Sequence, residues 1–136
     1  YDSWRGPFNI AMDYSWFAKD RKWQQQYAHR FQNFLYCEGL ETYVDQYNID
    51  GSTPDWILPA GGFQKLRHSL GLVSTAATAS LVTTHPKGWK FVDEIWDAKL
   101  EPYEDGYFDP YFDGLLYLFS LMQLSGNYQI ITPQAN

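Results

Sequence analysis

Four polar residues recur near the start of the chain at spacings of three, four and four: Asp2, Arg5, Asn9 and Asp13. A helix that extends upstream of residue 7 would place them on one face. A carboxylate beside a guanidinium stays ionised at neutral pH, because the opposite charge favours the anion. Asp2 is therefore a candidate general base. Tyr1 and Trp4 flank it and would supply flat apolar surface for stacking on a sugar ring.

The same residues also have a purely structural interpretation. A buried pair of Asp2 and Arg5 would fix a loop, while Asn9 and Asp13 would satisfy backbone groups. From spacing alone, this structural interpretation is the favoured one.

A second candidate lies at residues 103–113, which read YEDGYFDPYFD. Alternating aromatic rings and carboxylates suit a carbohydrate cleft, since the rings stack on C–H faces and the carboxylates accept hydrogen bonds from hydroxyl groups. Tyr107 and Tyr111 are the candidate sugar-binding residues here. In the structural alternative, Asp109 is the N-cap of the last helix, Pro110 is its first residue, and the aromatic rings belong to the core.

Other patterns that carry chemistry are missing from the sequence. The three histidines are too dispersed for a zinc site, and the single cysteine excludes an internal disulfide. No glycine-rich phosphate loop or Gly-x-Ser-x-Gly motif is present. The sequence predicts neither a metal site nor a cofactor.

Composition restricts the class of protein further. The 136 residues are 45% apolar and 19% aromatic, and the formal net charge is −6. The apolar content argues against intrinsic disorder, and the acidic balance without a basic cluster argues against nucleic acid and anionic membranes as partners. No apolar run is long enough to span a bilayer.

Five helices are predicted to position these residues, so the expected fold is all-α. They cover approximately residues 7–19, 21–38, 63–84 and 87–98, and a stretch after residue 110 that ends near Ser125. Gly39 and Gly126 are the expected stops of the second and fifth helices. Residues 43–49 (YVDQYNI) could pair briefly as a strand.

Several segments together resemble glycoside hydrolase family 8, in order along nearly the whole chain. They are YDSWR at 1–5, NIAMDYSWF at 9–17, HSLGLV at 68–73, AATASL at 76–81, YFDGLLY at 111–117 and LSGNY at 124–128. The resemblance implies an inverting hydrolase of β-1,4-linked polysaccharides with an (α/α)6 barrel, of which this chain would supply the last five helices. Residues 1–136 would then be a single partial domain, the C-terminal part of the barrel.

By this resemblance, Asp2 is the general base that activates water, and Arg5 orients the sugar-binding carboxylates. Tyr1 stacks at a subsite, and Tyr111 forms an aromatic wall on the far side of the cleft. The family's general acid is a glutamate on an early helix, upstream of anything in this chain. Inversion needs two carboxyl groups roughly 6.5–9.5 Å apart, so we expect this chain alone to be inactive. We also expect it to pair with the missing N-terminal segment or with a second copy.

The sequence of residues 9–17 is most similar to that of xylan-active members of the family. Reducing-end-specific members carry a Leu-His-Pro block before the penultimate inner helix, and residues 66–69 (LRHS) lack its proline. This difference predicts an endo-β-1,4-xylanase rather than an end-specific enzyme. The alternatives are a cellulase or chitosanase of the same family, or a non-catalytic helical domain for glycan binding or interaction. The compartment is unknown, with secretion favoured and the cytoplasm suited to an oligosaccharide-processing member.

Overall fold

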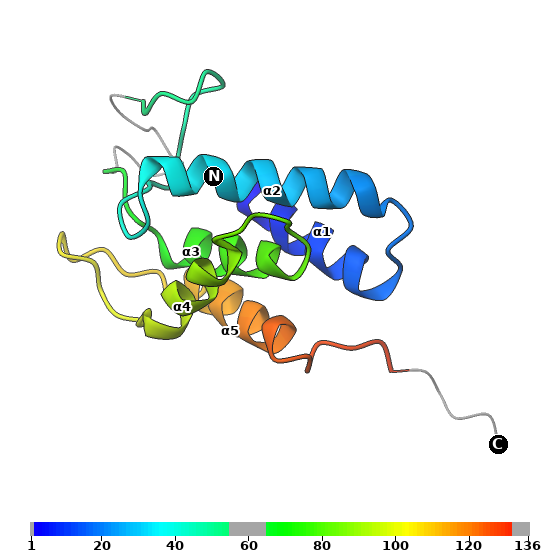
Figure 1. The fold of residues 1–136 in the computed structure, drawn as a ribbon. Coiled ribbons are helices and arrows are strands. Elements are labelled where there is room, and N and C mark those ends of the chain that lie inside the picture. Colours follow the sequence, from blue (N-terminus) through cyan, green and yellow to red (C-terminus); the bar gives the residue numbers. More distant parts are fainter. Residues whose placement is uncertain (1, 55–64, 132–136) are drawn as a thin grey trace.

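The computed structural model describes residues 2–54 and 65–131, and they form helices joined by loops (Figure 1). A short 3-10 helix, η1 (Asp2–Trp4), runs directly into α1 (Arg5–Trp16). The remaining elements are α2 (Arg21–Glu38), α3 (Leu70–Thr78), the 3-10 helix η2 (Ala79–Leu81), α4 (Gly88–Asp97) and α5 (Phe112–Leu124). Over the described residues there is no β-strand, in agreement with the all-α expectation.

The helices alternate in direction, so α1, α3 and α5 run parallel and α2 and α4 return antiparallel to them (Figure 1). α3 is the central helix, because it contacts α1, α4 and α5. The short connections 17–20 and 82–87 lie at one end of the bundle. The described parts of the long connections, residues 39–54, 65–69 and 98–111, lie at the other end, where α1, α3 and α5 begin.

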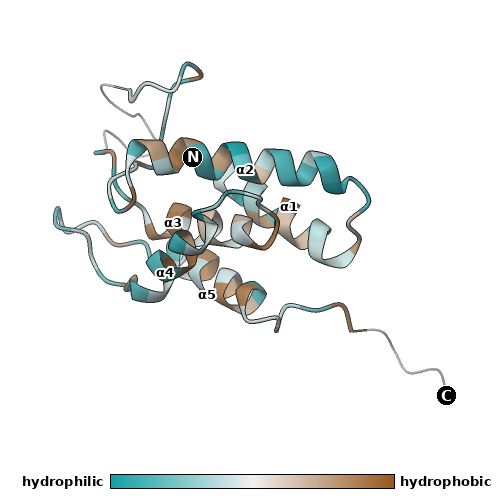
Figure 2. Cartoon of the chain, in the orientation of Figure 1, coloured by the Kyte–Doolittle hydropathy of each residue, from teal (hydrophilic) through white to brown (hydrophobic). Residues whose placement is uncertain are grey.

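The core is built around α3, in which all nine residues are buried. Its small side chains let neighbouring helix axes approach closely. Larger groups from the other elements fill the space around it, among them Leu35, Phe91, Ile95 and Leu116. Figure 2 shows the resulting pattern, with apolar colour concentrated on α3 and α5 and hydrophilic colour along α2.

The observed helices agree with the predicted ones to different degrees. The second helix is confirmed at residues 21–38, with Gly39 beyond it at a φ of 104°. The third was predicted over residues 63–84, but α3 spans only Leu70–Thr78 and continues as η2. Residues 63 and 64 lie outside the described part of the chain. Residues 65–69 are not helical, because the backbone of Arg67 accepts a hydrogen bond from the N–H of Asp45 at 2.8 Å.

The predicted strand at residues 43–49 is wrong. The backbone N–H groups of this segment bond in three different directions rather than to one neighbouring strand. Asp45 N–H donates to Arg67, Asn48 N–H donates to the carbonyl of Ser52, and Val44 N–H donates to the hydroxyl of Tyr47. The segment is therefore an irregular connection in which Tyr43 and Asp45 are buried and Ile49 is exposed.

Candidate active site

The first turns of α1, α3 and α5 meet at the end of the bundle that carries the long connections. The indole ring of Trp4, in η1, lies 5.8 Å from the ring of Phe112, the first residue of α5. Gly71, in the first turn of α3, approaches both helices so closely that an added Cβ would lie 3.1 Å from Trp4 Cζ3 and 2.7 Å from Asp113 Oδ1. The turn that contains Asp2 is thus packed against two other helix N-termini.

The predicted catalytic residues belong to this end. Asp2 lies in η1 and Arg5 is the exposed first residue of α1. The side chain of Asp2, and the whole of Tyr1, lie outside what the structure describes. The three helix N-termini each carry partial positive charge, which favours carboxylates at this end.

Trp4 does not offer the open stacking surface that the sequence suggested. Its side chain is only 4% exposed, and its Nε1 donates a hydrogen bond to the backbone carbonyl of Asp45 at 2.9 Å. The indole therefore packs within the core and holds the 43–45 segment against η1.

Asn9 and Asp13 lie with Arg5 on the exposed side of α1, as their spacing predicted. However, Asp13 is about 12 Å further along the helix axis than Arg5, at ~1.5 Å per residue. Its carboxylate accepts a short hydrogen bond from the side-chain amide of Gln24 on α2. Asp13 therefore connects α1 to α2 at the far end of the bundle.

A buried acidic network caps the start of α3, and it includes both ends of the predicted 103–113 cluster. Asp113 is 5% exposed, and its Oδ1 accepts a hydrogen bond from Gly71 N–H at 3.2 Å. Its Oδ2 accepts one from the hydroxyl of Tyr103 at 2.6 Å, and that hydroxyl accepts one from Leu70 N–H at 2.8 Å. Burial raises the pKa of Asp113, and the bond from Tyr103 opposes the rise. Two of the unpaired N–H groups of α3 are satisfied in this way.

Asp45 is the second buried carboxyl group of the network. It is 4% exposed, and its Oδ2 accepts a hydrogen bond from the hydroxyl of Ser69, the residue before α3. Burial raises the pKa of Asp45, and the bond from Ser69 partly offsets this. In the sequence, the one sign of this interaction is that Ser69, the partner of Asp45, directly precedes a helix. Nothing local to Asp45 distinguishes it from a surface residue.

The predicted aromatic cluster at residues 103–113 divides into three parts. Tyr103 and Asp113 belong to the buried network, whereas Tyr111 is 77% exposed. Tyr107 is half-buried and stacks on Tyr103, with ring centroids 6.1 Å apart. The guanidinium of Arg67 lies 4.2 Å from the centre of the Tyr107 ring.

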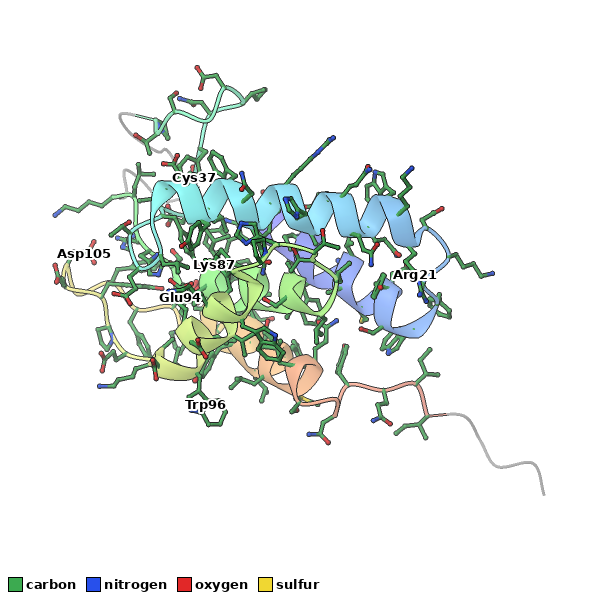
Figure 3. All side chains as sticks on the ribbon, in the orientation of Figure 1. Arg21, Cys37, Lys87, Glu94, Trp96 and Asp105 are labelled. Carbon is green, nitrogen blue, oxygen red and sulfur yellow. The ribbon has the colours of Figure 1, made fainter. Side chains whose placement is uncertain are left out.

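Arg67 also anchors the tip of the 98–111 connection, where Figure 3 labels Asp105. Its Nη2 lies 2.7 Å from Asp105 Oδ2. A cavity of about 470 Å³ is lined by Arg67 and Asp105 together with Tyr103, His68 and Glu104. Rings, a guanidinium and carboxylates thus surround an open space beside the start of α3, and such a set of groups suits a polyhydroxylated ligand.

The structural interpretation of Asp109 is also confirmed in its main point. Its Oδ1 accepts a hydrogen bond from Phe112 N–H at 2.8 Å, so the side chain caps the last helix. The helix begins at Phe112 rather than at Pro110.

Within the described part of the chain, no group of three or more His, Cys, Asp or Glu side chains is arranged to hold a metal ion. The described helices also include none that is long and apolar enough to cross a membrane.

Comparison with known proteins identifies xylan-degrading relatives. The chain is 33% identical over 129 residues to the reducing-end xylose-releasing exo-oligoxylanase Rex8A of Paenibacillus barcinonensis. It is 32% identical over 134 residues to the reducing end xylose-releasing exo-oligoxylanase of Halalkalibacterium halodurans. These matches cover 95% and 98% of this chain but only 30% and 31% of the relatives. No family model matches.

Solved structures agree in fold. Rex8A complexed with xylose superposes with a TM-score of 0.77 at 32% identity, over 97% of this chain and 31% of that chain. A GH8 xylobiose complex from Teredinibacter turnerae superposes with a TM-score of 0.70 at 30% identity, over 95% of this chain and 29% of that one. The fold class predicted from the sequence is confirmed: the chain corresponds to the C-terminal part of an (α/α)6 barrel, as in these neighbours.

Proposed function

We propose that this chain belongs to glycoside hydrolase family 8 and supplies part of the active site of an inverting enzyme that hydrolyses xylo-oligosaccharides. The observation that carries the proposal is the convergence of three helix N-termini around the Asp2 turn, in a chain whose matched relatives are exo-oligoxylanases. The chain spans about a third of the length of the curated relatives it matches, so the activity belongs to the protein that contains it.

Asp2 is the proposed general base, and Arg5, three residues on, orients carboxylates or substrate at the same end of α1. In an inverting reaction the base takes a proton from water as the oxygen attacks the anomeric carbon. A carboxylic acid on the opposite side protonates the leaving oxygen. That acid must come from a segment outside these residues. We therefore propose that residues 1–136 are a partial catalytic domain and are inactive alone.

The proposed substrate contacts lie on the 98–111 connection and at the start of α1. Tyr111 is exposed and free to stack on a sugar face. Tyr107, four residues earlier on the same connection, lies against Arg67, which lines the cavity beside α3. Tyr1 is proposed as a further stacking residue beside Asp2. Asn9 is the next polar residue along the exposed side of α1, and we propose that it contributes at the margin of the site. Asp13, bonded to Gln24 at the far end of the bundle, is not placed among these contacts.

The proposed enzyme could cleave within a xylan chain (endo action) or at its end (exo action). The missing proline at residues 66–69 predicts endo action, whereas both curated relatives are named for releasing xylose from the reducing end. The names of these relatives are the stronger support, so we propose oligosaccharides as substrates, with release of xylose from the reducing end. Product analysis on xylohexaose labelled at the reducing end decides this, because endo cleavage yields labelled products longer than xylose.

A further part of the proposal is that another helical segment covers one side of the bundle. Two large apolar side chains of α5, Leu115 and Leu118, are exposed one turn apart. Apolar surface of this kind on one helix face is uncommon on isolated monomers. We propose that the remainder of the barrel, or a second copy, covers it. A well-folded monomer in sedimentation at micromolar concentration would contradict this.

The test of the proposed function is Asp2→Asn in the complete enzyme that contains this chain. We expect kcat on xylo-oligosaccharides to fall by about 10²–10⁴-fold, the usual contribution of a general base, while xylobiose binding stays within about threefold. Asp20→Asn, an equal change at the exposed α1–α2 turn, is the control and should leave turnover unchanged. Full turnover by Asp2→Asn would exclude Asp2 as the base. Absence of hydrolysis of any β-1,4-linked glycan by the complete protein would favour a non-catalytic glycan-binding role.

A further inference from the structure

His68 lies two residues before α3, and both of its ring nitrogens face hydrogen-bond acceptors. Nδ1 is 2.7 Å from the backbone carbonyl oxygen of Tyr43. Nε2 is 3.1 Å from Oε1 of Glu94, which Figure 3 labels on α4. A carbonyl oxygen only accepts hydrogen bonds, so Nδ1 must carry a proton.

The second nitrogen faces the carboxyl group of Glu94. Oε1 of Glu94 already accepts a hydrogen bond from the backbone N–H of Glu41 at 2.9 Å, and Oε2 lies 2.7 Å from the hydroxyl of Tyr43. When Glu94 is ionised, Oε1 can only accept, so it is an acceptor toward Nε2 as well. A neutral imidazole has only one N–H group, so beside this carboxylate the geometry favours the imidazolium form of His68.

The surrounding charges favour that form. Glu94 and Glu41 face the ring, while Lys90, Asp93, Asp97 and Lys99 lie further around a cavity of about 450 Å³ that the ring lines. His68 also lines the cavity of about 470 Å³ described above, whose charged groups are Lys65, Arg67, Glu104 and Asp105. Burial alone would lower the pKa of His68. The bonds to Glu94 and to the Tyr43 carbonyl outweigh it and raise the pKa above the ordinary histidine value.

The 43–45 segment connects His68 to the candidate base. His68 holds the carbonyl of Tyr43, and two residues later the carbonyl of Asp45 accepts the hydrogen bond from Trp4 Nε1. Trp4 ends the η1 turn that begins at Asp2. A continuous series of contacts therefore runs from α4 through His68 to the start of α1.

We propose that His68, as an imidazolium, is a positioning residue that fixes the 43–45 segment and thereby the Trp4 indole and the turn carrying Asp2. The inference rests on the proposed function only in the role that it gives to Asp2. Its readouts are structural, so an inactive enzyme in which the coupling is intact would contradict the proposed function and not this positioning role.

The first experiment is a pH titration of the ¹⁵N-histidine-labelled chain, followed through the ring nitrogens by long-range ¹H–¹⁵N correlation. The chain has three histidines, and His85, near His29, is the internal comparison because burial and His29 lower its pKa. We expect His68 to show two protonated nitrogens at pH 6.5 and to lose its proton at a higher pH than His85. A neutral His68 tautomer at pH 6.5 would overturn the proposal.

The second experiment follows the Trp4 indole N–H, assigned by its disappearance in Trp4→Phe. Its protection from exchange, measured relative to the free tryptophan indole at the same pH, should fall with the same midpoint at which His68 loses its proton. In His68→Gln we expect exchange about tenfold faster than in the unchanged chain at pH 6.5, the scale of one lost charge-assisted bond. His85→Gln is the matched control and should leave it unchanged. If Trp4 N–H exchange responds neither to the His68 titration nor to His68→Gln, the coupling is refuted. If His68→Gln fails to fold, the titration of the unchanged chain still tests the coupling.

Discussion

Replacing Tyr103 by phenylalanine removes a single oxygen that serves two buried groups at the start of α3. The hydroxyl donates to Asp113 Oδ2 at 2.6 Å and accepts from Leu70 N–H at 2.8 Å. The variant leaves a carboxyl group that is 5% exposed with one donor fewer, and a backbone N–H without this acceptor. A bond to a charged group contributes about 1.5–3 kcal/mol, and an unsatisfied buried donor costs about 1–3 kcal/mol. Since the two costs are not fully additive, we expect Tyr103→Phe to lower the free energy of unfolding by about 2–5 kcal/mol in urea denaturation at pH 7.

The cost should depend on pH in a defined direction. Burial raises the folded-state pKa of Asp113, so this carboxyl group favours folding most below its unfolded pKa, and that contribution is lost as pH rises through the folded pKa. The Tyr103 hydroxyl stabilises the ionised carboxylate. Its removal therefore costs more above the folded pKa of Asp113 than below it, and the stabilities of variant and unchanged chain should approach each other in acid.

Tyr107→Phe is the matched control, because it removes the hydroxyl of the ring stacked on Tyr103. That hydroxyl makes one long bond, 3.4 Å to Asp109, on a half-buried side chain. A loss below about 0.5 kcal/mol is expected, as for substitutions away from buried networks. If the two variants cost the same, or if the Tyr103→Phe cost is independent of pH, the hydroxyl does not support the buried carboxylate as described.

Two further predictions concern the same end of the molecule. Gly71→Ala should lower the melting temperature, because its Cβ would lie 2.7 Å from Asp113 Oδ1. Gly114→Ala is the control in the same thermal melt. Its Cβ would meet only the flexible end of a leucine at 3.3 Å, so this change should be neutral or stabilising. Hydrogen bonds from Arg67 hold the pKa of Asp105 below its ordinary value, so NMR titration of Arg67→Gln should show that pKa rising. An Asp105 pKa that Arg67→Gln leaves unmoved would mean that the ion pair is absent in solution.

Helical periodicity predicted the elements well wherever a helix has one apolar face. The second helix is an example, since its apolar residues follow the 3.6-residue repeat and a glycine with positive φ ends it. The prediction failed at residues 65–69 and 43–49. These two irregular segments are joined by hydrogen bonds beside the start of α3, among them the one from Asp45 N–H to the Arg67 carbonyl. Such pairing depends on contacts between distant segments, which no local pattern contains.

The candidate site was predictable to a similar extent. Residue types near Asp2 and in the 103–113 cluster pointed to the end of the molecule at which the candidate site lies, because aromatic rings and carboxylates concentrate there. They did not separate lining from core. Trp4 is buried, and Tyr103 lines the cavity while its hydroxyl supports the buried Asp113. Asp45 was missed because a buried acid is recognised only by its partners, which are distant in sequence.

The unequal connections at the two ends of the bundle have a consequence for how such a protein can diversify. The turns at residues 17–20 and 82–87 are short, whereas residues 39–54, 65–69 and 98–111 belong to longer connections at the end that carries Asp2 and Tyr111. Insertions and substitutions in these connections would reshape the surroundings of the cavity while leaving the packed α3 layer intact. This end of the bundle can therefore vary while the scaffold is retained, and an engineer could graft loops there for the same reason.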